Sequence, residues 1–125
     1  VIETRIDKNG RWVILKGRLN GQDITLGSIY APNQGQLEFL GELAPVLREV
    51  TTGNMLIGGD FNCVLDVDRD RSIPPLHNAP AHKIAKGLAR WSSNWDLEDI
   101  WRVRHQDDRE YSFYSPVHDI HVRLD

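Results

Sequence analysis

The stretch Asn54-Met55-Leu56-Ile57-Gly58-Gly59-Asp60-Phe61-Asn62 decides how the fold of this chain is interpreted. Its apolar start predicts a short strand, and the two glycines allow a tight turn and a close approach to a ligand. Because side chains alternate along an extended segment, Asp60 and Asn62 are expected on one side and Phe61 in the core. A carboxylate and an amide so placed outline a phosphoryl-transfer site. An ordinary turn is the alternative, since Gly, Asp and Asn are common turn residues for local reasons.

A second group of polar residues, Tyr30-Ala31-Pro32-Asn33, follows another strand-like run at residues 24–29. Pro32 fixes its own φ and pushes Ala31 toward extended geometry, which sets the direction of Asn33. If the two strands lie side by side in one sheet, their polar ends meet at one edge, where sites on sheet scaffolds are commonly built. The sequence therefore predicts one cluster of four residues: Tyr30, Asn33, Asp60 and Asn62.

With these residues the chain resembles the exonuclease–endonuclease–phosphatase superfamily, whose members cleave phosphodiester or phosphomonoester bonds with Mg²⁺. Within that superfamily it is most similar to the endonuclease domain of LINE-type non-LTR retrotransposons, itself similar to apurinic/apyrimidinic endonucleases. Several motifs that occur in the right order and at compatible spacings are more specific for a family than any one of them alone. Four further segments carry the resemblance: Asp70-Arg71-Ser72, Leu97-Glu98-Asp99-Ile100-Trp101-Arg102, Tyr111-Ser112-Phe113-Tyr114-Ser115 and Arg123-Leu124-Asp125.

The resemblance implies an α/β fold with two stacked mixed β-sheets flanked by helices, a four-layer sandwich of the DNase-like type. It implies one partial domain over residues 1–125, truncated at both ends. In the family, strands carrying an Asn and the metal-binding Glu come before the position of Val1, and a Ser-Asp-His motif follows that of Asp125. None of the five histidines in the chain stands where that motif would be. The chain is therefore expected to be the central part of an enzyme.

Residue roles follow from the same resemblance. Asp60 would orient or deprotonate the attacking water, Asn62 would bind a phosphate oxygen, and Tyr30 would support the phosphate or the leaving group through its hydroxyl. Asn33 would brace this network. Mg²⁺ is expected as cofactor of the complete domain, without a metal ligand that we assign in this chain. The remaining candidates are Asp125, which would orient the absent histidine, Ser112, which would lie close to the site, and Arg71, which would contact the DNA backbone.

Composition fits a globular protein, with 40% hydrophobic and 26% charged residues and no apolar run near the ~20 residues that span a bilayer. Cys63 is the one cysteine, so no intrachain disulfide forms and a reducing compartment is favoured. The resemblance implies a nuclear parent protein that also contains a reverse transcriptase. The net charge of −3 argues weakly against nucleic-acid binding. Residues 69–90, however, hold five Lys or Arg against Asp70 alone, as a basic rim for a polyanion or a solvated helix face.

Local patterns predict alternating strands and helices. Residues 11–18 and 23–30 are strand-like, and Asn20-Gly21 between them is a strong hairpin signal. Leucines recur at three- and four-residue steps over residues 36–50 and predict a helix, although Pro45 predicts a kink or a new start. A second helix is expected from about Pro80 to Ser93. Residues 111–115 and 120–125 are expected to form two more strands.

Three hypotheses of function remain open on the sequence. The first is a metal-dependent endonuclease that nicks one DNA strand for retrotransposition. The second keeps the fold and acts on an inositol phosphate, a phospholipid head group or an abasic site. The third is a non-catalytic fragment that lacks the metal Glu and the catalytic His. Absent outer strands also predict self-association through exposed sheet edges.

Overall fold

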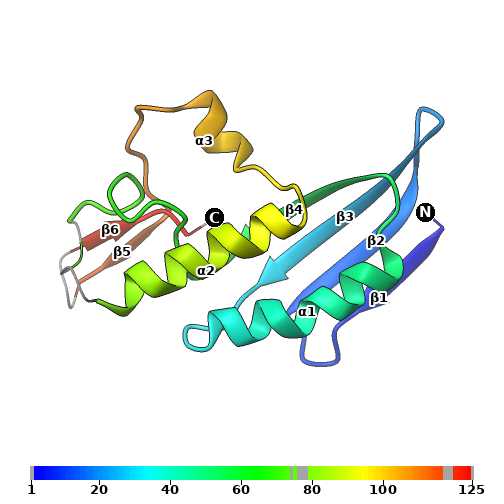
Figure 1. Cartoon of the computed structure of the whole chain (residues 1–125), viewed down its shortest axis with the longest axis horizontal. Coiled ribbons are helices and arrows are strands. Elements are labelled where there is room, and N and C mark those ends of the chain that lie inside the picture. The colour runs from blue at the N-terminus through cyan, green and yellow to red at the C-terminus, as the bar shows by residue number, and fades with distance from the viewer. Residues whose placement is uncertain (1, 74, 76–78, 117–119, 125) are drawn as a thin grey trace. The chain divides into compact units, whose positions relative to one another are not determined.

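The computed structural model of the chain describes residues 2–73, 75, 79–116 and 120–124 (Figure 1). It divides into two compact units, Val1–Asn62 and Cys63–Asp125, which are described separately below. The prediction of a single domain stays a prediction. No helix within the described ranges is long and apolar enough to cross a membrane.

The first unit contains a four-stranded mixed sheet with the strand order β1-β2-β3-β4. β1 (Glu3–Ile6), β2 (Trp12–Leu19) and β3 (Gln22–Tyr30) are antiparallel to their neighbours, whereas β4 (Asn54–Asp60) is parallel to β3. The predicted hairpin is confirmed. Asn20 and Gly21 have φ values of 53° and 79°, as the two-residue turn that matches the twist of paired strands requires.

Helix α1 (Gln36–Val50) connects β3 to β4, and its bounds agree with the prediction. Its buried leucines and Val50 form the core of the unit with Ile14, Thr25 and Ile29, which share one face of the sheet. An ion pair of 3.1 Å from Arg5 on that face to Glu49 ties the helix to β1. Of the two outcomes predicted at Pro45, the new start is wrong, because one helix runs through this residue, and the kink stays a prediction. Pro45 and Gly41 are exposed, so the carbonyl that loses its partner can bond to water.

The opposite face of the sheet is partly open. Val13, Leu26 and Leu56 on this face are 37%, 38% and 58% exposed. β1 and β4 are the edges of the sheet. Self-association through such edges stays a prediction.

The second unit contains α2 (Pro80–Asn94), α3 (Ile100–Arg104) and a two-stranded antiparallel sheet of β5 (Phe113–Ser115) and β6 (Ile120–Val122). The predicted helix at 80–93 is confirmed with one further residue, and both predicted strands exist but are shorter. Ala85 and Leu88 form the buried side of α2. α3 was not predicted, since its five residues are too few to show a helical period.

The predicted α/β class is thus confirmed by a mixed four-stranded sheet with one connecting helix, and by a second unit of two helices and a small sheet. The stacking of two sheets into a four-layer sandwich stays a prediction.

Candidate functional site

The ends of β3 and β4 lie side by side, as predicted from their polar residues. In the parallel register Tyr30 is the partner of Asp60, and the backbone N–H of Ala31 donates to the carbonyl of Asp60 at 2.8 Å. Ile29, one position before Tyr30, is buried under α1, so Tyr30 and Asp60 emerge from the opposite, open face. The Tyr30 side chain is 55% exposed there. A phenol and a carboxylate are therefore neighbours at one end of the sheet.

Gly59 makes this close pairing possible. Its φ is 130°, and a Cβ atom on it would lie 2.0 Å from the carbonyl oxygen of Ile29. The neighbouring Gly58 has no atom within 4 Å of the same position. Of the two glycines that the sequence singled out, only Gly59 is required by the backbone.

The strand ends at Asp60, and the following residues form a turn. The Asp60 Oδ1 atom accepts a hydrogen bond of 2.9 Å from the backbone N–H of Asn62. Asn62 has a φ of 49°, in the left-handed region that asparagine tolerates. The expectation that strand alternation aligns Asp60 with Asn62 is wrong, because the side-chain bond to the backbone turns the chain before Asn62.

Gln36 and Asn62 tie together the loops that follow β3 and β4. The Gln36 Nε2 atom donates to the carbonyls of Asn33 and Asn62, both at 2.9 Å, and Asn62 Nδ2 donates to the carbonyl of Ala31 at 2.6 Å. Gln36 is only 7% exposed. Gln36 was not among the predicted site residues, although it occupies a position of the apolar stripe of α1, where a polar residue signals a specific partner. The side chain of Asn33 is exposed.

Arg11 is a further residue that the sequence analysis missed. Its guanidinium lies over the Tyr30 ring at 4.9 Å, and Nη1 donates to the Tyr30 carbonyl at 3.4 Å. Such stacking attracts a cation to the ring face. The position of Arg11 follows from the hairpin, because a turn at Asn20-Gly21 places Arg11 opposite Tyr30. A cation therefore stands in the same row as the phenol and the carboxylate.

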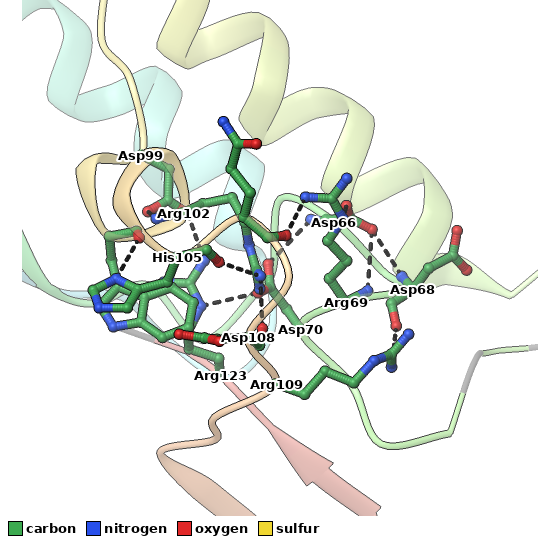
Figure 2. Close-up of polar contacts among 12 residues, drawn as sticks. Asp66, Asp68, Arg69, Asp70, Asp99, Arg102, His105, Asp108, Arg109 and Arg123 are labelled. Carbon is green, nitrogen blue, oxygen red and sulfur yellow. Dashed lines mark hydrogen bonds and ion pairs between the residues drawn. The ribbon is translucent and has the colours of Figure 1, made fainter.

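A buried ion-pair network organises the second unit (Figure 2). Asp70 is 1% exposed, and its Oδ1 accepts from Arg102 Nη2 at 2.5 Å and from Arg123 Nε at 2.9 Å. Arg123 Nη2 also donates to Asp99 Oδ2 at 2.5 Å. The Asp99 Oδ1 atom caps α3 by accepting from the backbone N–H of Arg102 at 3.2 Å. Three segments of the chain are joined by these bonds.

The cations of this network also pack on one aromatic ring. The guanidinium carbons of Arg102 and Arg123 lie 4.9 and 4.7 Å from the Trp101 ring centre, and His105 stacks on it at 4.7 Å. Burial lowers the pKa of Arg123, but the hydrogen bonds that Arg123 donates to Asp70 and Asp99 outweigh it and hold that pKa above the ordinary guanidinium value. Arg123 is thus a fixed cation whose role here is to join segments of the fold.

The remaining predicted site residues lie in the second unit. The Ser112 Oγ atom accepts from the backbone N–H of Leu124 at 3.0 Å. Arg71 forms a β-bridge with Val122, and its Nε is buried without a hydrogen-bond partner among the described residues. Asp125 lies outside the described residues. The roles that the resemblance implies for these three stay predictions.

No group of three or more His, Cys, Asp or Glu side chains able to hold a metal is found within the described ranges. Asp60 is the carboxylate that stands at the polar end of β3 and β4. Mg²⁺ is often bound through one or two carboxylates, waters and substrate phosphates, so Asp60 fits a partial ligand set.

Comparison with known proteins adds a biological setting. No protein-family model matches the sequence. Over 116 residues the chain is 30% identical to a Xenopus laevis protein described as "Transposon TX1 uncharacterized 149 kDa protein". The chain is similar to a transposon protein. The match covers 90% of this chain and 8% of the Xenopus protein. The similarity supports the predicted retrotransposon origin of the chain.

Proposed function

We propose that this chain is part of a Mg²⁺-dependent endonuclease that nicks DNA for target-primed retrotransposition, and that the complete domain is a four-layer α/β sandwich. The observation that carries the proposal is the register of β3 and β4, which seats Tyr30 beside Asp60 on the open face of the sheet. The similarity to a transposon protein supports DNA as the substrate.

Hydrolysis of a phosphodiester needs a positioned water, neutralised charge on the phosphate and a stabilised leaving oxygen. The turn at Asn62 occupies Asp60 Oδ1, and no described hydrogen bond reaches Oδ2, which orients or deprotonates the water. The Tyr30 hydroxyl donates to the phosphate or to the leaving oxygen. Asn62 retains its Oδ1 atom and one N–H for the network around the phosphate, although Nδ2 already donates to Ala31.

Mg²⁺ supplies charge neutralisation at the phosphate when it is bound. Asp60 is the ligand or near neighbour that this chain offers, and a further carboxylate from outside the described residues would be needed to complete the set. Oxygen donors of this kind are the ones that Mg²⁺ prefers. The same residues would serve an inositol phosphate, a phospholipid head group or an abasic site, and those substrates remain alternatives within the proposal.

A non-catalytic role is the second candidate, and the turn at Asp60 favours it. One Asp60 oxygen and the Asn62 amide make local bonds that an ordinary turn also makes. On this interpretation the polar residues stabilise the strand ends and do no chemistry. The substitution of Asp60 by asparagine separates the two candidates, because it keeps the Oδ1 acceptor and removes the charge.

The experiment uses a longer protein, expressed from the coding sequence that contains residues 1–125 and extends on either side of them. We expect nicking of supercoiled plasmid in Mg²⁺ and a loss of about 100-fold or more in Asp60→Asn, as for removal of a general base. The control Asp23→Asn removes an exposed carboxylate from β3 and should keep the rate. Residues 1–125 alone should nick near background. An unchanged rate in Asp60→Asn contradicts the proposal, and phosphate release with intact plasmid points to a phosphatase.

A further inference from the structure

Helix α2 carries three cations along one side. Lys83, Lys86 and Arg90 are exposed, whereas Ala85 and Leu88 are buried. At about 100° per residue the three cations fall within roughly 60° of the helix circumference, on the side opposite the two buried residues. We call Lys83, Lys86 and Arg90 the α2 stripe.

The sequence around the α2 stripe is free of acidic residues. Residues 71–95 contain no Asp or Glu, in a chain that has 18 of them. Within the described part of the chain, none of the three cations makes an ion pair. Like charges three and four residues apart destabilise a helix by about 0.2–0.5 kcal/mol per pair. The arrangement is therefore unfavourable for the helix itself, and binding of an anionic partner would offset the repulsion.

Other exposed residues of α2 decide which polyanion fits. They are Pro80, Ala89, Ser93 and Asn94, and no large exposed apolar side chain stands among them. A helix that binds a membrane surface needs bulky apolar residues beside its cations to enter the lipid. A nucleic-acid backbone needs only the charges. From Lys83 to Arg90 the helix rises about 10 Å, which is roughly three nucleotide steps along one strand.

We infer that the α2 stripe binds the phosphate backbone of nucleic acid without reading its sequence. This inference rests on the proposed function in one respect: the polyanion that the α2 stripe binds is taken to be nucleic acid. It assigns the affinity for substrate to a helix in the second unit, apart from the residues proposed to carry out hydrolysis.

The test is the salt dependence of binding of residues 1–125 to a fluorescein-labelled 20-base-pair duplex, measured by anisotropy in EDTA. Three phosphate contacts contribute a slope of about −2.7 to log K against log [salt], or a loss of about 40-fold in affinity between 50 and 200 mM KCl. The variant Lys83→Gln/Lys86→Gln/Arg90→Gln should lack this contribution to the slope. The single variant Lys86→Gln should lower the slope by about 0.9, and it guards against misfolding of the triple variant.

The control variant Lys8→Gln/Arg48→Gln/Arg104→Gln removes the same charge from three exposed positions without described ion pairs. It should keep the slope of the wild type. Equal losses in the two triple variants would show a general charge effect and overturn the inference. Absence of duplex binding by the wild type, or stronger binding to phosphatidylserine vesicles than to duplex, would also overturn it. Because EDTA removes catalysis, binding through the stripe and nicking through Asp60 fail independently.

Discussion

Replacement of Gly59 by alanine tests whether the close pairing of β3 and β4 builds the candidate site. The added Cβ atom would lie 2.0 Å from the Ile29 carbonyl oxygen, and a φ of 130° is strained for any residue but glycine. The backbone strain costs about 1–3 kcal/mol. Relief of the overlap requires the strands to separate and to lose the bond between Ala31 and Asp60, about 1 kcal/mol. We expect Gly59→Ala to lower the free energy of unfolding by about 3 kcal/mol.

The matched control is Gly58→Ala, because its Cβ atom meets nothing within 4 Å. Alanine in place of a strand glycine should stabilise by about 0.5–1 kcal/mol. Urea unfolding followed by circular dichroism measures both variants, and the expected loss for Gly59→Ala corresponds to a midpoint lower by about 2 M. In the longer protein the same variant should lose nicking. Midpoints for the two variants within about 0.5 M of each other would refute the reasoning.

Two further predictions concern buried polar groups. Asp70→Asn leaves two guanidinium groups facing a neutral amide in the interior and should lower the free energy of unfolding by about 3–5 kcal/mol. The control Asp23→Asn breaks an exposed ion pair and should lower the free energy of unfolding by less than about 1 kcal/mol. Equal urea midpoints for Asp70→Asn and Asp23→Asn would contradict the prediction. Gln36→Leu removes two hydrogen bonds and should cost about 2 kcal/mol. Gln34→Leu at an exposed position should change the urea midpoint little, and a similar loss in both variants would show that the bonds are not responsible.

Sequence patterns predicted those parts of the fold that depend on neighbouring residues. Asn20-Gly21 fixed the hairpin because both residues accept a positive φ. Leucine spacing fixed α1, since a buried helix face repeats every three to four residues. The polar ends of β3 and β4 predicted that the strands meet, and the register of Tyr30 with Asp60 confirms that arrangement.

Contacts between distant residues could not be predicted in this way. Asp70 is 32 residues from Arg102 and 53 from Arg123, and no local pattern signals that the three meet. The bonds of Gln36 depend on how two loops approach a helix end. The turn at Asn62 forms because the Asp60 side chain accepts a hydrogen bond from the nearby backbone N–H of Asn62. The sequence does not show whether an aspartate makes such a local bond or leaves the backbone extended.

Some residues that carry the family resemblance are largely buried in the second unit, and others are partly open to solvent at the end of β3 and β4. Asp70, Arg102 and Arg123 come from three of the matching segments, and they bond to one another in the interior. These residues stabilise the second unit, because a buried carboxylate that is paired with two guanidinium groups is not available to a substrate. Under the proposed function, hydrolysis therefore depends on the open end of β3 and β4. Asp60→Asn keeps the acceptor of the turn, so it should lower nicking without lowering the urea midpoint, whereas Asp70→Asn should lower both.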